Sequence, residues 1–360
     1  MPTESQIREA LATVKYPGFS RDIVSFGIVK EVLIDGEDAT VKMQVATSDP
    51  AVPQAIHDQS IEALKSVDGL VSAQIDFDIQ EPPQAAGAPG VGGAAVAASI
   101  PGVKNIIAIA SGKGGVGKST VSSNLAAALM KSGAKVGICD CDLYGPSIGM
   151  MFGCDDERPL ANAENEIIPI VKDGLKMMSM SFLLEDTSPV IVRGPLATRY
   201  TQQFLRQVEW GELDYLILDL PPGTGDIQLT IVQTVSLSGA VIVTTPQEVA
   251  LTDARKAVSM FGKVNVPILG IVENMSYFQC PSDGVRYDIF GSGGGQREAE
   301  RLGVPLLGQV PIDIPTREGG DEGRPVVTQG DADNPASQAF DSIVDELVKS
   351  LDSVKATSPA

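Results

Sequence analysis

The chain has 360 residues, which is long for one hydrophobic core and favours two domains or one domain with an appendage. Its net charge of −19 argues against nonspecific nucleic-acid binding and against docking on anionic membranes, because both depend on Lys and Arg. Its four cysteines are too few for a disulfide scaffold, and we expect neither a signal peptide nor a membrane span. These features predict a cytoplasmic protein with reduced thiols.

The first 80 residues predict a small α+β domain without cysteine. Two alternating segments are expected to form a hairpin at Asp35-Gly36, and a helix that stops near Gly69 leads to a third strand. The expected elements are helices at Ile7–Val14 and Ala55–Ser66 and strands at Ile23–Val32, Ala39–Val45 and Val71–Ile79.

Residues 81–102 predict a flexible linker. From Glu81 to Pro101 the chain consists mostly of Pro, Ala, Gly and Val, with no charge after Glu81. Such a stretch supplies no packed core, so it is the clearest domain boundary in the sequence.

Residues 103–351 predict an α/β domain. Short runs that are apolar on both faces alternate with helical stretches, which indicates a mostly parallel sheet covered by helices on both faces. The predicted strands are Ile106–Ala110, Val136–Cys139, Tyr215–Leu218, Ala240–Val243 and Ile268–Val272. A final helix is expected at Ala336–Leu351, followed by a disordered tail over residues 352–360.

A glycine-rich loop with the pattern G-x-x-x-x-G-K-[ST] lies between the first of these strands and an expected helix at Ser119–Ser132. Glycines let backbone N–H groups close on phosphate oxygens, and the following helix directs its positive end at them. Lys118 would reach the β- and γ-phosphates of a nucleotide, and Ser119 would place its hydroxyl on Mg²⁺. The predicted binding loop comprises Gly112, Lys113, Gly114, Gly115, Val116, Gly117, Lys118, Ser119 and Thr120. A glycine turn without a ligand is the alternative.

Two further strand ends supply carboxylates. Asp219 ends an apolar run at the edge where open α/β sheets bind ligands, and it would hold the water shell of Mg²⁺. Asp140 and Asp142 follow another strand; Asp142 is the candidate for positioning the attacking water, with Asp140 nearer Mg²⁺. Roles in turns or helix caps are the alternative for all three. Residues 221–226 follow Asp219 and are expected to sense the γ-phosphate.

These motifs resemble those of the MinD-like P-loop ATPases. The string Lys113-Gly-Gly-Val-Gly-Lys118-Ser-Thr120 is similar to their deviant Walker A motif, in which the extra lysine, here Lys113, reaches the nucleotide of a dimer partner. The strings Asp140-Cys-Asp-Leu-Tyr-Gly-Pro-Ser147, Asp219-Leu-Pro-Pro-Gly-Thr-Gly-Asp226 and Glu273-Asn-Met-Ser276 resemble the Mrp/ApbC branch.

The resemblance spans residues 103 to about 330 and implies a homodimeric ATP hydrolase that carries iron–sulfur clusters to apo-proteins. It also implies that Asn274 contacts the adenine base, a capping or backbone role being the alternative. The front domain more loosely resembles a small domain of iron–sulfur assembly proteins, with Tyr16-Pro17-Gly18 where that family often has Asp-Pro-Glu. We expect it to be a docking or regulatory module.

The segment after Asn-Met-Ser departs from the family pattern. The family usually presents C-x-x-C there, and two such pairs hold a four-iron cluster across a dimer with four thiolates. This chain has Cys280-Pro-Ser-Asp283, and a carboxylate is a poorer ligand than a thiolate for iron–sulfur iron. A 4Fe-4S cluster bridging two subunits through Cys280 and Asp283, a labile cluster, another metal, a cluster shared with an acceptor protein and no cluster all stay open.

Two other functions are also open. A MinD- or ParA-like positioning or regulatory switch without a cluster would share Lys113 and Lys118. It would need a basic amphipathic tail or a DNA-facing patch, and the sequence shows neither. The second is an assembly scaffold in which the nucleotide only stabilises the fold.

Overall fold

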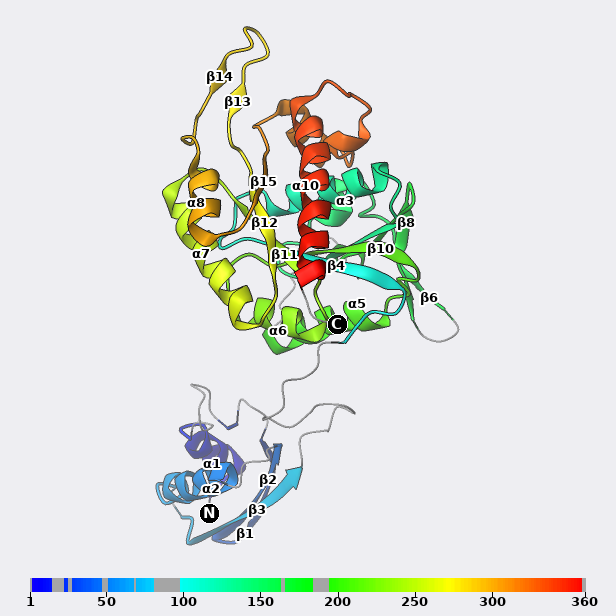
Figure 1. Cartoon of the computed structure of the whole chain (residues 1–360). Coiled ribbons are helices and arrows are strands. Elements are labelled where there is room, and N and C mark those ends of the chain that lie inside the picture. Colours follow the sequence, from blue (N-terminus) through cyan, green and yellow to red (C-terminus); the bar gives the residue numbers. More distant parts are fainter. Residues whose placement is uncertain are drawn as a thin grey trace. The chain divides into compact units, whose positions relative to one another are not determined.

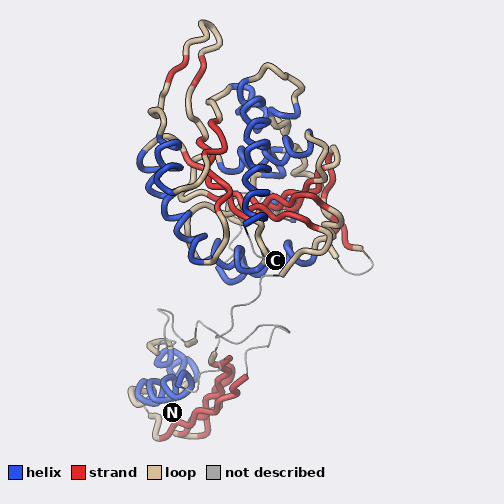
Figure 2. The backbone as a smooth tube through the Cα atoms, viewed as in Figure 1, coloured by secondary structure: helices blue, strands red, loops and turns tan. Residues whose placement is uncertain are grey.

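The computed structural model describes residues 2–14, 23–24, 28–46, 51–67, 69–80, 98–162, 166–183 and 194–357. The chain divides into two compact units, Met1–Ala94 and Ala95–Ala360, and each has its own hydrophobic core (Figures 1 and 2). The end of the predicted linker belongs to the second unit, because Ala98 pairs with Val235 and Ile100 is buried. Residues 81–97 lie outside the described residues, so the linker there stays a prediction.

The first unit is a three-stranded sheet with two helices packed against it (Figure 1). β2 lies in the middle, antiparallel to β1 and parallel to β3. The elements are α1 (Glu4–Leu11), β1 (Val29–Asp35), β2 (Asp38–Ala46), α2 (Ala51–Leu64) and β3 (Ser72–Gln80). The hairpin turn is confirmed, with Asp35 opposite Asp38 and Gly36 in the left-handed region at φ 65°.

The strand predicted from Ile23 is wrong at its start. Ile23 lies in a turn, where its backbone N–H donates to the carbonyl of Val14, and the strand begins only at Val29. The side chain of Ile23 is nevertheless fully buried in the core of the first unit. Burial of a turn residue therefore produced the same apolar signal as a strand.

The second unit contains an eight-stranded sheet in the order β15-β12-β11-β4-β10-β5-β9-β8. Every neighbouring pair is parallel except β8–β9, which confirms the mostly parallel sheet. The strands are β4 (Val103–Ala110), β5 (Val136–Asp140), β8 (Ile170–Lys172), β9 (Leu175–Met178), β10 (Leu213–Asp219), β11 (Gly239–Thr244), β12 (Ile268–Glu273) and β15 (Leu306–Gln309). Two short antiparallel pairs lie outside this sheet: β6 (Leu160–Ala161) with β7 (Ile167–Ile168), and β13 (Phe278–Gln279) with β14 (Arg286–Tyr287).

Helices cover both sides of this sheet (Figure 2). α3 packs with α10, while α5 packs with α6 and α7 with α8. They are α3 (Lys118–Lys131), α4 (Ile148–Met151), α5 (Gly194–Gln207), α6 (Asp226–Thr234), α7 (Glu248–Lys263), α8 (Gly294–Leu302), α9 (Ile314–Asp321) and α10 (Pro335–Thr357). None of the helices in the described part of the chain combines the length and apolarity of a membrane span.

The last helix is longer than predicted. α10 continues to Thr357 instead of ending at Leu351, because Leu351 is buried and Val354 also packs against the core. Residues 352–357 are therefore helical and not part of a disordered tail, while 358–360 lie outside the described residues.

Leu351→Ala tests how the end of α10 packs against the core. We expect it to lower the free energy of unfolding of the second unit by about 2–5 kcal/mol, because a buried leucine leaves a cavity. Denaturation can be followed by the fluorescence of Trp210, which is the chain's single tryptophan and is buried in this unit. The exposed Lys355→Ala on the same helix should change stability by less than about 0.5 kcal/mol. Equal effects of both variants would contradict the packing.

Candidate nucleotide-binding site

The P-loop connects the carboxyl end of β4 to the first turn of α3. Its backbone is left-handed at Gly115 and Gly117, with φ values of 80° and 77°. No side chain caps the start of α3, and a cavity of about 250 Å³ opens at this loop. A Cβ at Gly117 would lie 2.2 Å from Nδ2 of Asn274, so glycine is required there for space as well as for φ. The loop can therefore receive an anion at the helix N-terminus.

Lys118 and Asp219 form a buried ion pair beside this loop. Nζ of Lys118 lies 2.6 Å from Oδ1 of Asp219, and both side chains are almost inaccessible. The hydroxyls of Ser119 and Ser122 donate to the two carboxylate oxygens at 2.6 and 2.5 Å. Ser122 lies one turn into α3 and falls outside the P-loop pattern, so the motif gave no sign of its role. The hydrogen bonds and the ammonium offset the cost of burying the carboxylate.

Asp140 lies in register with Asp219 on the neighbouring strand β5. Burial, and next the charge of Asp219, raise the pKa of Asp140 to about 7, whereas hydrogen bonds from backbone N–H groups oppose the shift. The opposing bonds come from Ile148 and Ser147. Asp140 also accepts the backbone N–H of Asp142 and the hydroxyl of Ser179. Asp140 thus fixes the loop between β5 and α4 to the end of the sheet.

Asp142 and Lys113 both line the cavity of the P-loop. One carboxylate oxygen of Asp142 accepts the backbone N–H groups of Tyr144 and Gly145 at 3.3 Å, so the residue shapes a turn and also faces the cavity. The side chain of Lys113 is half-buried, and its ammonium makes no hydrogen bond or ion pair within the described residues. The predicted phosphate-sensing loop also reaches this place, since Pro222 lines the cavity.

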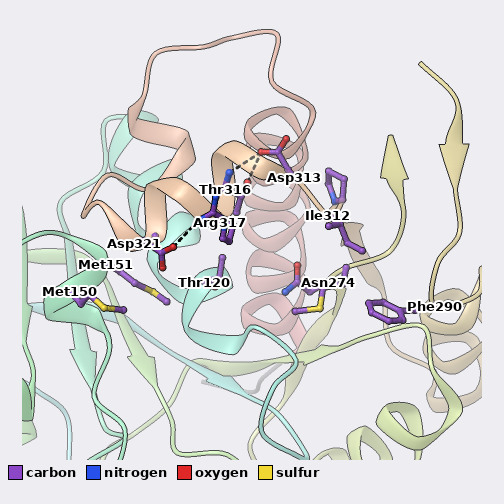
Figure 3. Close-up of a pocket in the computed structure, with 13 residues that line it drawn as sticks. Thr120, Met150, Met151, Asn274, Phe290, Ile312, Asp313, Thr316, Arg317 and Asp321 are labelled. Carbon is purple, nitrogen blue, oxygen red and sulfur yellow. Dashed lines mark hydrogen bonds and ion pairs between the residues drawn. The ribbon is translucent and has the colours of Figure 1, made fainter. Parts of the chain in front are cut away.

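A second cavity of about 410 Å³ shares Thr120 and Met151 with the first (Figure 3). Nδ2 of Asn274 donates to the carbonyl of Val116 at 2.9 Å, which ties the end of β12 to the P-loop. The residues that line the cavity are Thr120, Met150, Met151, Asn274, Met275, Phe290, Pro311, Ile312, Asp313, Thr316, Arg317, Gly320 and Asp321. Most of them come from α4, from residues 311–313 and from α9, and no sequence motif pointed to these segments. We call this space the base cavity, after the adenine base that the resemblance predicts beside Asn274.

Cys280 lies on the hairpin of β13 and β14, which extends beyond the helices of the second unit (Figure 1). It is partly exposed, and its Sγ lies 3.1 Å from Oγ of Ser282. Asp283 accepts the backbone N–H of Val285 at 2.9 Å and so closes the tip of the hairpin. In the part of the chain that the structure describes, no three His, Cys, Asp or Glu side chains are grouped so that they could hold a metal ion. A single subunit thus offers no closed metal site at this hairpin.

The other cysteines belong to the core. Cys139, Cys141 and Cys154 are buried, and the first two sulfur atoms are 4.0 Å apart. The contact with Cys139, together with burial, raises the pKa of the Cys141 thiol, and burial raises that of Cys154 to about 11. Cys141 and Cys154 therefore disfavour the thiolate form that metals bind.

The P-loop at the end of β4, beside Asp219 at the end of β10, defines a P-loop NTPase with a mostly parallel sheet. Residues 102–348 match the family described as the NUBPL iron-transfer P-loop NTPases, and the chain belongs to this family. Residues 4–77 match the family described as iron–sulfur cluster assembly proteins. The resemblance found in the sequence is therefore confirmed for both units.

Similar proteins carry names that agree with this assignment. A protein of Deinococcus radiodurans named iron–sulfur cluster carrier protein is 43% identical over 338 residues, which cover 94% of this chain and 93% of that protein. A protein of the same name in Escherichia coli is 52% identical over 228 residues, which cover 63% of this chain and 62% of that protein. A nucleotide-binding protein of Archaeoglobus fulgidus, solved in complex with ADP, is similar in structure with a TM-score of 0.58 and 40% identity, over 66% of this chain and 92% of that one. MinD of Pyrococcus horikoshii with Mg-ADP has a TM-score of 0.55 and 26% identity, over 71% and 100%.

Gly117→Ala tests the geometry of the loop. The added methyl group would strain a left-handed residue and displace Asn274, so we expect the affinity for MgADP to fall about fivefold to 150-fold, as steric strain of about 1–3 kcal/mol implies. Gly262→Ala on α7 is the control, because a Cβ there meets nothing within 4 Å. Calorimetric titration measures both affinities. Unchanged binding by Gly117→Ala would contradict the role of the loop.

Proposed function

We propose that this protein is a cytoplasmic homodimer that binds and hydrolyses ATP with Mg²⁺ and carries iron–sulfur clusters to apo-proteins. The observation that carries the proposal is the buried Lys118–Asp219 pair at the P-loop, in a chain whose relatives are named cluster carriers. The absence of a membrane span among the described helices is compatible with the proposed location.

The two cavities suggest how a nucleotide would lie. Its phosphates fit the P-loop cavity, and its base fits the neighbouring cavity, where methionine and phenylalanine side chains supply an apolar surface. Asn274, which lines the base cavity, would contact the adenine. Lys118 would leave the carboxylate of Asp219 and bind phosphate oxygens instead, so that its ammonium keeps a negatively charged partner.

The residues beside Lys118 fit Mg²⁺. The hydroxyl of Ser119 and the carboxylate of Asp219 lie 2.6 Å from each other, and Mg²⁺ prefers oxygen ligands of these kinds. Asp140, in register with Asp219, would support the water shell. The ion, when bound, neutralises developing charge on the phosphates.

Lys113 and Asp142 supply the remaining groups. The Lys113 ammonium has no partner among the described side chains, which supports a role across a dimer, where it would reach the nucleotide of the second copy. This is the deviant Walker A role that the sequence implies. Asp142 has a second carboxylate oxygen beyond the one that closes its turn, and this oxygen would orient the attacking water.

Clusters would be cargo at the hairpin of Cys280. Two copies of the hairpin would bring two thiolates and two carboxylates from Cys280 and Asp283 to a 4Fe-4S cluster. Because the carboxylates are weak ligands for this iron, such a cluster would be labile, which suits transfer to an acceptor. The alternative function is a MinD- or ParA-like switch without a cluster. It is favoured by Asp283, a carboxylate at the position where the family pattern usually has a cysteine.

Steady-state ATP hydrolysis separates catalysis from a structural nucleotide. We expect Lys118→Ala and Lys113→Ala each to lower kcat at least about 100-fold, because a group that stabilises transferring phosphate is worth that much. Lys113→Ala should retain ATP binding, since its side chain would act on the partner's nucleotide. Lys104→Ala is the control, on an exposed lysine paired with Asp214. Turnover equal to this control in both variants would contradict ATP hydrolysis at the P-loop.

Anaerobic reconstitution with iron and sulfide tests the cargo site. Cys280→Ala should reduce bound iron to background, whereas Asp283→Cys should retain the cluster longer against a chelator, because a thiolate replaces a carboxylate. Cys154→Ala, in the core, is the matched control and should bind as much iron as the unchanged protein. Equal iron content in the unchanged protein and Cys280→Ala would reject Cys280 as the carrier.

A further inference from the structure

Glu273 is a fully buried carboxylate at the end of β12 that neither the P-loop nor the cysteine site accounts for. Its Oε1 accepts the hydroxyl of Ser276 at 2.6 Å and Nε2 of Gln309 at 2.7 Å. Its Oε2 accepts the backbone N–H of Gly295. The donors come from a loop, a strand end and the first turn of α8, so one carboxylate joins three separate segments.

Two of these donors flank the hairpin that carries Cys280. Ser276 precedes β13, and Gly295 lies in the first turn of α8, which follows β14 in the chain. We call residues 277–293 the hairpin segment. Both of its ends are thus held by the two oxygens of Glu273.

The contacts around the start of α8 explain the glycine-rich run at 291–295. A Cβ at Gly295 would lie 2.8 Å from Oε2 of Glu273, and one at Gly294 would lie 2.5 Å from the carbonyl oxygen of Pro246. Gly291 and Gly293 have left-handed φ values of 90° and 66°. Glycines therefore allow the turn before α8, and Gly295 lets the helix begin next to the carboxylate.

The same strand end also builds the base cavity. Asn274 and Met275 follow Glu273 directly and line this cavity, and Met275 is held at φ 52°, a left-handed conformation that is strained for a side chain of its size. The next residue, Ser276, is the one bonded to Glu273. The hydrogen bonds of Asn274 and Ser276, on the two sides of Met275, hold this strained residue in place.

The adjoining wall of the base cavity, which contains Ile312, is bonded to the start of the hairpin segment. The backbone N–H of Ser276 donates to the carbonyl of Val310 at 2.9 Å, and that of Ile312 donates to the carbonyl of Tyr277 at 2.6 Å. Phe278 forms a bridge with Ile312. A ligand that orders this wall therefore also orders the first strand of the hairpin.

We propose that Glu273 is a positioning residue that couples the base cavity to the hairpin of Cys280. Glu273 binds both ends of the hairpin segment and the turn after Asn274. Nucleotide binding in the base cavity therefore also orders the hairpin. The inference rests on the proposed nucleotide binding at the P-loop. Because coupling between sites is reciprocal, a ligand on the hairpin also changes the affinity for nucleotide by the same factor.

Tryptic cleavage after Arg286 in the full chain measures the opening of the hairpin. Arg286 is accessible on β14, and cleavage there requires the hairpin to open locally. In the unchanged protein we expect saturating MgADP to slow this cleavage at least about fivefold, the lower range of coupling between two sites. In Glu273→Gln an NH₂ group replaces one carboxylate oxygen, so it faces at least one of the three hydrogen-bond donors and cannot accept from it. Cleavage without nucleotide should therefore be faster, and the protection by MgADP should be lost. Mass spectrometry of the fragments gives both rates.

Glu298→Gln is the matched control, because Glu298 is a second buried carboxylate on α8 but binds Arg255 at 2.8 Å instead of the hairpin. It should retain the protection by MgADP. Ser276→Ala removes one donor to Glu273 without creating a large cavity, and it should lose part of the protection by MgADP. This variant tests the coupling if Glu273→Gln does not fold.

The inference is overturned if Glu273→Gln keeps the full protection by MgADP. If Glu273→Gln does not fold, full protection in Ser276→Ala overturns it. It is also overturned if the unchanged protein binds MgADP in a calorimetric titration but is cleaved at the same rate with and without it; nucleotide binding would then survive. A failure to bind MgADP at all would reject the proposed function together with the coupling.

Discussion

The buried ion pair between Lys118 and Asp219 is the interaction on which the rest of the second unit depends. A carboxylate without access to water needs compensation, and here an ammonium and two hydroxyls supply it. This requirement holds the P-loop over the end of β10 and orients the first turns of α3. Two of these groups, the Lys118 ammonium and the Ser119 hydroxyl, are also ones that phosphate and Mg²⁺ would use, so a nucleotide would rearrange contacts that hold the site together.

The constraint extends to the loops around the pair. Asp140, beside Asp219 across the β5–β10 pairing, has its pKa raised to about 7 and anchors the loop that carries Asp142. On the opposite side, Asn274 bonds the P-loop, and Glu273 next to it fixes the hairpin of Cys280. The elements proposed to bind nucleotide and cargo therefore meet at neighbouring residues of one strand end.

The sequence predicted the parts of this arrangement that are local in the chain. The five apolar strand runs and the P-loop were recognisable because a buried parallel strand and a phosphate loop each have a continuous pattern. Short strands such as β9 and β15, with four residues each, lack such a pattern. The base cavity combines α4 with the segment before α9, and Glu273 contacts donors 3 to 36 residues away, so neither could be read from local spacing. The errors at Ile23 and Leu351 arose because burial alone does not distinguish a turn from a strand or mark the end of a helix.

Cluster transfer measures the central claim most directly. The protein, reconstituted anaerobically with iron and sulfide, is mixed with apo-aconitase, and the recovery of aconitase activity is followed with and without MgATP. The account predicts recovery by the unchanged protein at a rate that MgATP alters, and no effect of MgATP on Lys118→Ala. Recovery no faster than with iron and sulfide alone would contradict a carrier, and it would leave the switch without a cluster as the better account of this fold.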